Sequence, residues 1–368
     1  MGGPEMAPHT PQRSASPGKA GGRLGRLTLL SPRLARFGRP TPLSPRLACF
    51  GPLTLLSPRS ARLGRLAPLI LIVAGLLLGC PDPAVEAAAK LRVVATIPDL
   101  KALTEAVGGD RVEVDALARG TQNPHDLEIR PSLMVKLRRA DALVVNGLEL
   151  DSWAEVAVHG SNNGRIITGA PGYIDASRGI QPLEVPSGRV DRSMGDVHPL
   201  GNPHYTLDPG QAPAITATIL DGLARLAPEH RATFERNRQA FLARLEQAMA
   251  RWNATMGPLR GAKTVAYHND WVYLFTRFGI TQVGTIEERP GIPASPAHLA
   301  RLIRTMKEQA VKAVVVEPWS DQQLAGRVAR ETGARLVVLN AKLGQSSGPD
   351  AYIATTDANI AALSAVLR

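Results

Sequence analysis

From residue 91 onward, short apolar runs of strand length alternate with stretches of helical periodicity. The apolar runs predict β-strands at 91–97, 111–117, 141–147, 263–268, 280–286, 312–318 and 334–340. Helical patterns occupy 99–107, 130–140, 295–309 and 350–367. Strands that alternate with helices in this way are typical of parallel sheets, so the pattern predicts an α/β fold.

Two segments depart from this alternation. Residues 160–200 are rich in glycine, serine and proline, and they predict a long surface loop. Residues 228–256 contain no glycine and no internal proline, and their large apolar residues recur at helical spacings, at Phe234, Phe241, Leu245, Met249 and Trp252. We therefore predict two βα lobes with parallel-type sheets, at 81–227 and 257–368, joined by a long rigid helix at 228–256.

The net charge of the chain, +11, is concentrated at its N-terminal end. Residues 1–79 hold eleven Lys and Arg but one acid, whereas the remainder is close to neutral. The positive net charge of the chain therefore comes from this leader, and it does not indicate binding to nucleic acid. Within 1–65 the sequence SPRLARFG returns every thirteen residues as SPRLACFG and SPRSARLG. This repeat predicts either a disordered basic tail or a spurious leader translated from upstream of the true start codon.

A short apolar segment follows the basic leader. Arg62 and Arg65 precede an apolar run at 66–78, which is shorter than the roughly 20 residues that span a bilayer. The run ends in Leu-Leu-Gly-Cys, which resembles a bacterial lipobox. We therefore predict a lipoprotein signal at 66–80 with lipid attached to Cys80; an ordinary secretory signal is the alternative. The only other cysteine is Cys49, so any metal bound by the mature chain needs His, Asp or Glu ligands.

Three histidines lie at the ends of predicted strands or in loops. His125 in TQNPHDLE and His204 in GNPHYTLDP both follow Asn-Pro, and His268 in KTVAYHND ends an apolar run. Ligands of open α/β sheets gather beyond the carboxyl ends of the strands, so the three side chains are expected to face one cleft between the lobes. Three neutral imidazoles are a usual ligand set for Zn²⁺. Metal binding is expected to weaken below about pH 6, where imidazoles protonate.

Further side chains lie close to these histidines in the sequence. Asp126, Asp208 and Asp270 each lie within four residues of one of them, and they are expected to orient the rings as hydrogen-bond acceptors. His198, six residues before His204, is either a further ligand or an accessory capture site.

The chain also contains four longer motifs: NPHDLEIRPSLMVKLRRADALVVNGLELDSW, GNPHYTLDP, VAYHNDWVYLFTRFGI and EERPGIPASPAHLARLI. In this order they resemble the solute-binding proteins of zinc and manganese ABC transporters (cluster A-I), over nearly all of 91–368. The resemblance implies a buried metal site of three histidines and one carboxylate between two lobes, with His125, His204 and His268 as the histidines. It also implies a monomeric, lipid-anchored protein of the periplasm or cell envelope that delivers metal to an ABC permease in the inner membrane.

The fourth ligand departs from the family pattern. The usual aspartate after the penultimate strand of the second lobe aligns with Asn340, whose amide is a poorer and uncharged ligand. Glu287 is the predicted replacement, and Asn340, Glu317 or a water molecule are the alternatives. The His-rich loop of many zinc-binding members is also missing. Three histidines without a carboxylate replacement nevertheless favour zinc over manganese, because Mn²⁺ prefers oxygen ligands.

The sequence thus predicts a metal receptor and not an enzyme. A three-histidine zinc hydrolase is the main alternative, and it requires an open coordination position and a general base. No HExxH motif is present. A surface adhesin is a third possibility, for which no residue argues independently.

Overall fold

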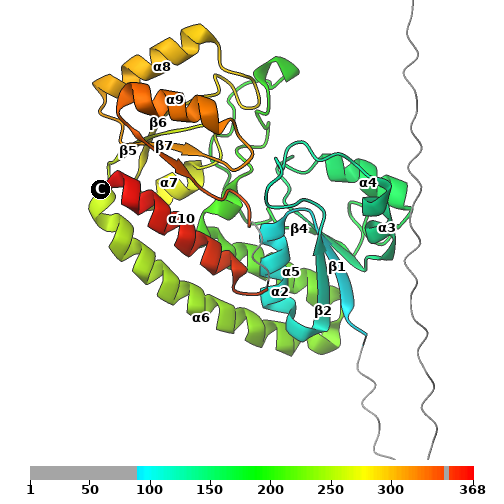
Figure 1. Ribbon diagram of the computed structural model, residues 1–368. Helices are drawn as coiled ribbons and strands as arrows, with labels where there is room; N and C mark the ends of the chain where they lie inside the picture. Colours follow the sequence, from blue (N-terminus) through cyan, green and yellow to red (C-terminus); the bar gives the residue numbers. More distant parts are fainter. Residues whose placement is uncertain (1–88, 344–347) are drawn as a thin grey trace, which may run out of the picture. The chain divides into compact units, whose positions relative to one another are not determined.

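Two four-stranded parallel sheets organise the computed structural model, which describes residues 89–343 and 348–368 (Figure 1). The leader and Cys80 lie outside the described residues. Both sheets belong to the unit Pro81–Arg368. In both sheets the first strand of the lobe has the second strand on one side and the third on the other. The crevice at such a reversal of strand order is the usual ligand site of an open α/β sheet.

The first lobe contains the sheet β2-β1-β3-β4. Its strands are β1 (Leu91–Ala95), β2 (Val112–Ala116), β3 (Ala142–Val145) and β4 (Tyr173–Asp175). Its helices are α2 (Pro98–Gly108), α3 (Pro131–Arg139), α4 (Trp153–Ser161) and α5 (Ala212–Leu226). Val93, Val94 and Ala95 of the inner strand β1 are buried, as their apolar run predicts.

The second lobe repeats this arrangement in the sheet β6-β5-β7-β8. Its strands are β5 (Lys263–Ala266), β6 (Thr281–Thr285), β7 (Ala313–Val316) and β8 (Arg335–Val338). Its helices are α7 (Val272–Phe278), α8 (Pro296–Glu308), α9 (Gln322–Thr332) and α10 (Ala351–Leu367). Helix α8 begins as the sequence predicts, because the Ser295 hydroxyl accepts a hydrogen bond from the backbone N–H of His298.

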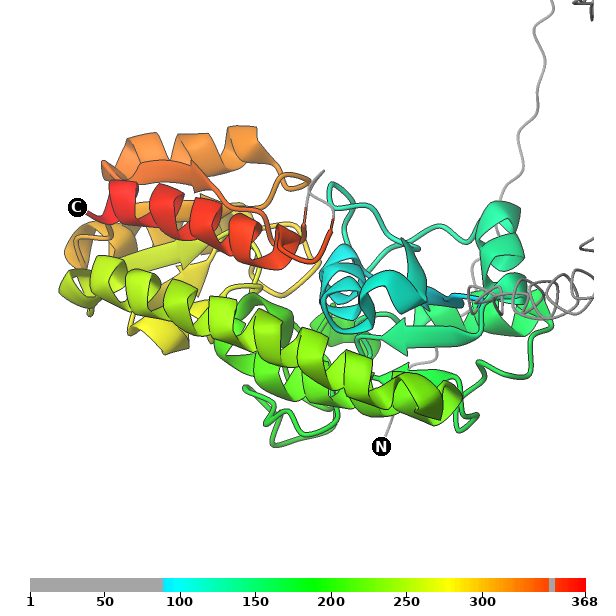
Figure 2. The ribbon, with the colours of Figure 1, turned by 90° about the horizontal axis from the view of Figure 1, so that it is seen from below.

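Helix α6 (Arg231–Met256) connects the two lobes. It packs against α2 and α5 of the first lobe and against α10 of the second, as Figures 1 and 2 show from two directions. Phe234, Phe241 and Trp252 of its predicted apolar face are buried in a core that continues from the first sheet to α10. The predicted long helix is therefore confirmed, and its packing on both lobes limits their relative motion.

The predicted loop at 160–200 is partly wrong. Tyr173–Asp175 form the edge strand β4, which pairs in parallel with β3, and α4 extends to Ser161. The strand is only three residues long and lies between glycine-rich turns, so no alternation of apolar and polar residues marks it in the sequence.

Among the described helices, none has the length and apolar character needed to cross a membrane.

Candidate metal centre

The two Asn-Pro-His segments fold in the same way. In each, the asparagine side chain accepts a hydrogen bond from the backbone N–H of the histidine two residues later: Asn123 from His125 at 3.1 Å, and Asn202 from His204 at 3.0 Å. Asparagine and proline are both typical of tight turns. The repeated sequence thus fixes the backbone of each histidine within a loop.

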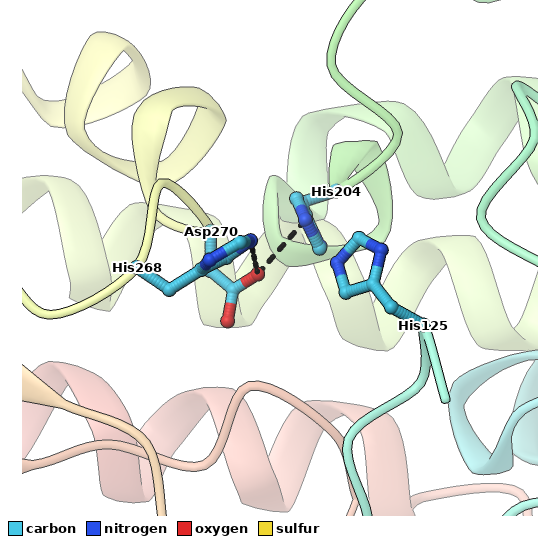
Figure 3. A group of neighbouring side chains, drawn as sticks. All are labelled: His125, His204, His268 and Asp270. Carbon is cyan, nitrogen blue, oxygen red and sulfur yellow. Dashed lines mark ion pairs between the residues drawn. The ribbon is translucent and has the colours of Figure 1, made fainter. Parts of the chain in front are cut away.

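The structure brings the three predicted histidines together with Asp270. Each of these four side chains offers a ligand atom, and these atoms all lie within 4.8 Å of one another (Figure 3). His125 comes from the loop after β2 and His204 from the loop between β4 and α5, whereas His268 and Asp270 follow β5. The cluster therefore lies between the lobes, as the sequence predicts.

Asp270 was expected only to orient a ring, but it lies inside the cluster. Its Oδ1 is 2.9 Å from Nε2 of His204 and 3.8 Å from Nε2 of His268. The contact with His204 lacks the alignment of a hydrogen bond, and Oδ1 has no donor among the described residues. Nε2 of His125 and Nδ1 of His204 are also buried without a hydrogen-bond partner in the described chain.

Unpaired buried polar atoms are costly, at about 1–3 kcal/mol each. A bound cation would satisfy such atoms, so three of them within one small cluster favour a metal-binding role for it. Three imidazole nitrogens and one carboxylate oxygen are a donor set that suits Zn²⁺ and similar divalent ions. The residues present thus fit a metal ion.

Glu287, the predicted fourth ligand, contacts His268 on the side of the ring that faces away from Asp270. Its Oε2 lies 2.7 Å from Nδ1 of His268 and accepts a hydrogen bond from the backbone N–H of Gly291 at 2.8 Å. Nε2 of His268 is the nitrogen that faces Asp270. A carboxylate in the position of Glu287 fixes the tautomer and the orientation of a ligand histidine.

The alternative carboxylate, Glu317, is not part of the cluster either. Glu317 is fully buried and accepts hydrogen bonds from Trp271 at 2.6 Å and Ser320 at 2.9 Å. The backbone of Asn340 is paired with the side chain of Asn359.

Two of the three predicted ring-orienting acids are engaged elsewhere or exposed. Asp208 forms a two-pronged ion pair with Arg277, with distances of 2.7 and 2.8 Å, so its expected role beside His204 is wrong. Asp126 is exposed.

Burial and neighbouring charges shift the pKa values of the histidines in the cluster in opposite directions. Burial lowers the pKa of His125 and of His204. Burial also works against the charged form of His268, but Asp270 and Glu287 outweigh it and raise the pKa of His268 to about 9. Burial opposes ionisation of Asp270, but the neighbouring His204 and His268 hold its pKa below the ordinary value. The site therefore has an ionised carboxylate available for a cation.

Residues 93–366 match the family described as "Zinc-uptake complex component A periplasmic" (ZnuA). The chain belongs to the ZnuA family. Among individual relatives, it is 26% identical over 260 residues to the high-affinity zinc uptake system protein ZnuA of Bacillus subtilis, covering 70% of this chain and 80% of that protein. It is 25% identical over 258 residues to the zinc-binding lipoprotein AdcA of Streptococcus pneumoniae, where the match covers 69% of this chain and only half of AdcA.

A solved structure of a ZnuA deletion mutant with zinc bound has the same fold. It aligns with a TM-score of 0.64 at 27% identity, and the alignment covers 75% of this chain and 98% of that one. The resemblance to zinc and manganese solute-binding proteins is thus confirmed at the level of the ZnuA family.

Proposed function

We propose that this protein is the extracytoplasmic receptor of an ABC importer for zinc. It holds one Zn²⁺ between its lobes through His125, His204, His268 and Asp270 and passes the ion to a permease. The observation that carries this proposal is the convergence of four ligand atoms within 4.8 Å in the crevice between the lobes.

The donor set supports zinc as the cargo. Three nitrogen donors and one oxygen donor favour Zn²⁺ over Mn²⁺, which prefers sites richer in oxygen. The relatives named for zinc point the same way. A manganese-binding homologue is the alternative, and competition between the two ions for one purified sample decides between them.

The protein is proposed to bind and release metal without catalysis. Four protein ligands complete a tetrahedral shell, whereas a catalytic zinc keeps a position for water. The zinc-loaded protein should therefore hydrolyse neither ester nor phosphoester substrates, and zinc-dependent turnover would instead support the hydrolase alternative.

The test of the proposed function is a titration of metal-free protein with zinc against a chelator of known affinity. We expect one Zn²⁺ per chain, and a loss of affinity by orders of magnitude in His204→Ala. His298→Ala is the control, because Nε2 of His298 is paired with the backbone oxygen of Thr285 at 2.9 Å, away from the cluster. Equal affinity in the wild type and in His204→Ala would refute the site.

The location of the protein follows from its proposed role. We propose that the mature chain is a monomer held at the envelope membrane by a lipid on Cys80, where it meets its permease in the inner membrane. Fractionation of cells that produce the Cys80→Ser variant tests the anchor. The variant is expected in the soluble envelope fraction and the wild type in the membrane fraction.

A further inference from the structure

His198 lies beside the metal centre without belonging to it. Its ring stacks on that of His125, with the centroids 5.2 Å apart and the planes at 24°. It is not among the four side chains whose ligand atoms converge within 4.8 Å. In this arrangement His198 therefore contacts a proposed ligand without completing its shell.

The free nitrogen of His198 lacks a partner. Its Nε2 is buried and makes no hydrogen bond to any described residue. A neutral imidazole with an unused nitrogen is a ligand for divalent transition metals.

The cavity on this side opens onto the cluster. A cavity of about 250 Å³ is lined by His198 and Asp196 together with His204 and His268 of the cluster. A second cavity of about 250 Å³ approaches from another side and includes His125 and Asp270. Asp196 and His268 line both cavities, so Asp196 is a carboxylate at the junction of the two approaches.

The loop that carries Asp196 and His198 is fastened to the second lobe. The backbone N–H of Asp196 donates to the carbonyl of Pro290 at 2.8 Å, and Arg289 donates to the carbonyl of Ser193 at 2.5 Å. These bonds hold the loop against the turn that contains Glu287, the partner of His268. These bonds to the second lobe thus hold the segment next to His198 in place.

We propose that His198, assisted by Asp196, is a transfer ligand that holds a divalent metal ion transiently as it moves between solvent and the four-residue centre. This inference rests on the proposed function and adds a kinetic role to that site. A ligand outside the final shell lowers the barrier to exchange in both directions and leaves the equilibrium affinity unchanged, because it is vacated in the loaded state.

The test measures zinc uptake and zinc release separately in the full mature chain. Uptake is followed by stopped flow from a chromophoric zinc–chelator complex, and release is followed into excess chelator. We expect both rates to fall by about tenfold in His198→Ala and in His198→Gln, with the Kd unchanged within about threefold. His159→Ala, which removes an exposed histidine at the end of α4, should match the wild type.

The absorption spectrum of the Co²⁺-loaded protein provides a second readout. The band positions and intensities should be the same in His198→Ala and in the wild type, because the four resident ligands are retained. Unchanged transfer rates, an altered Co²⁺ spectrum or a large loss of affinity in the variant would each overturn the inference. Failure of the wild type to bind zinc would instead refute the proposed function itself.

Discussion

The carboxylate of Asp270 lies 2.9 Å from Nε2 of His204, although the two residues come from different lobes. His204 belongs to the loop before α5, and Asp270 follows the first strand of the second sheet. Both side chains are almost fully buried, at 2% exposure each. Their closeness places a negative charge beside the proposed imidazole ligands, where a divalent cation is attracted to it.

Asp270→Asn is expected to weaken zinc binding by at least about a hundredfold. The amide keeps the shape of the side chain but removes the charge, and an uncharged oxygen is a poorer ligand. Competitive titration with a chelator measures the change. Asp126→Asn is the matched control, because Asp126 is an exposed acid next to His125; it should bind zinc within about twofold of the wild type. Equal effects of the two substitutions would exclude Asp270 as a ligand.

Glu287→Gln should reduce zinc affinity about 10- to 100-fold, as is typical when the partner of a ligand histidine is lost. The charged acceptor on Nδ1 of His268 makes Nε2 a stronger donor to the metal, and glutamine supplies no charge. Glu288→Gln tests the specificity of this effect. Glu288 is exposed and bonds to Ser295 and Arg301, so its replacement should leave affinity unchanged. A loss as large as that in Asp270→Asn would indicate that Glu287 is itself a ligand.

Part of this site could be predicted from the sequence, because its residues follow predicted strands. Strands β5 and β6 are parallel neighbours, so the residues that follow them, His268 and Glu287, emerge at the same edge of the sheet. Inner strands of a parallel sheet are buried on both faces, so β1, β3 and β7 could be recognised from their apolar runs. The three histidines were expected in the crevice because they lie at strand ends or in loops.

The role of Asp270 could not be predicted in the same way. Its distance from His204 depends on how one lobe sits against the other, which no local pattern encodes. The signal that was present is its position two residues after His268. The contact of Glu287 with Nδ1 of His268 likewise depends on the turn at 287–292, in which the backbone N–H of Gly291 donates to the same carboxylate.

Zinc binding is expected to release about one proton per ion at pH 7.5. Asp270 and Glu287 raise the pKa of His268 to about 9, so this ring is protonated in the metal-free protein and must lose its proton to bind. The apparent affinity should therefore fall about tenfold per pH unit as the pH drops below about 9, well above the pH 6 expected for ordinary imidazoles. Calorimetry in two buffers of different ionisation enthalpy measures the proton count. A count of zero would contradict this titration.

Glu317→Gln should flatten the pH dependence of stability in the metal-free protein. Burial, reinforced by Asp270, raises the pKa of Glu317 from 4.5 to about 8. The folded state then binds one more proton than the unfolded state between these values, so its stability falls as the pH rises, by up to about 1.4 kcal/mol per pH unit. Glutamine keeps the shape and cannot ionise. Urea unfolding at several pH values from 5 to 8 should give a wild-type slope steeper than that of the variant, and parallel slopes would refute the prediction.

Arg277→Met should destabilise the fold by about 2–4 kcal/mol without removing the metal ligands. Arg277 of α7 holds the carboxylate of Asp208 through two short bonds, and Asp208 is only 4% exposed, so its charge becomes buried and unpaired in the variant. Arg244→Met is the control, since its ion pair with Asp350 is exposed and should contribute at most about 1 kcal/mol. Denaturant unfolding compares the two. Because the cluster is retained, saturating zinc should raise the Tm of both variants. Equal destabilisation of the two variants would show that the buried Asp208–Arg277 pair contributes no more to stability than an exposed ion pair.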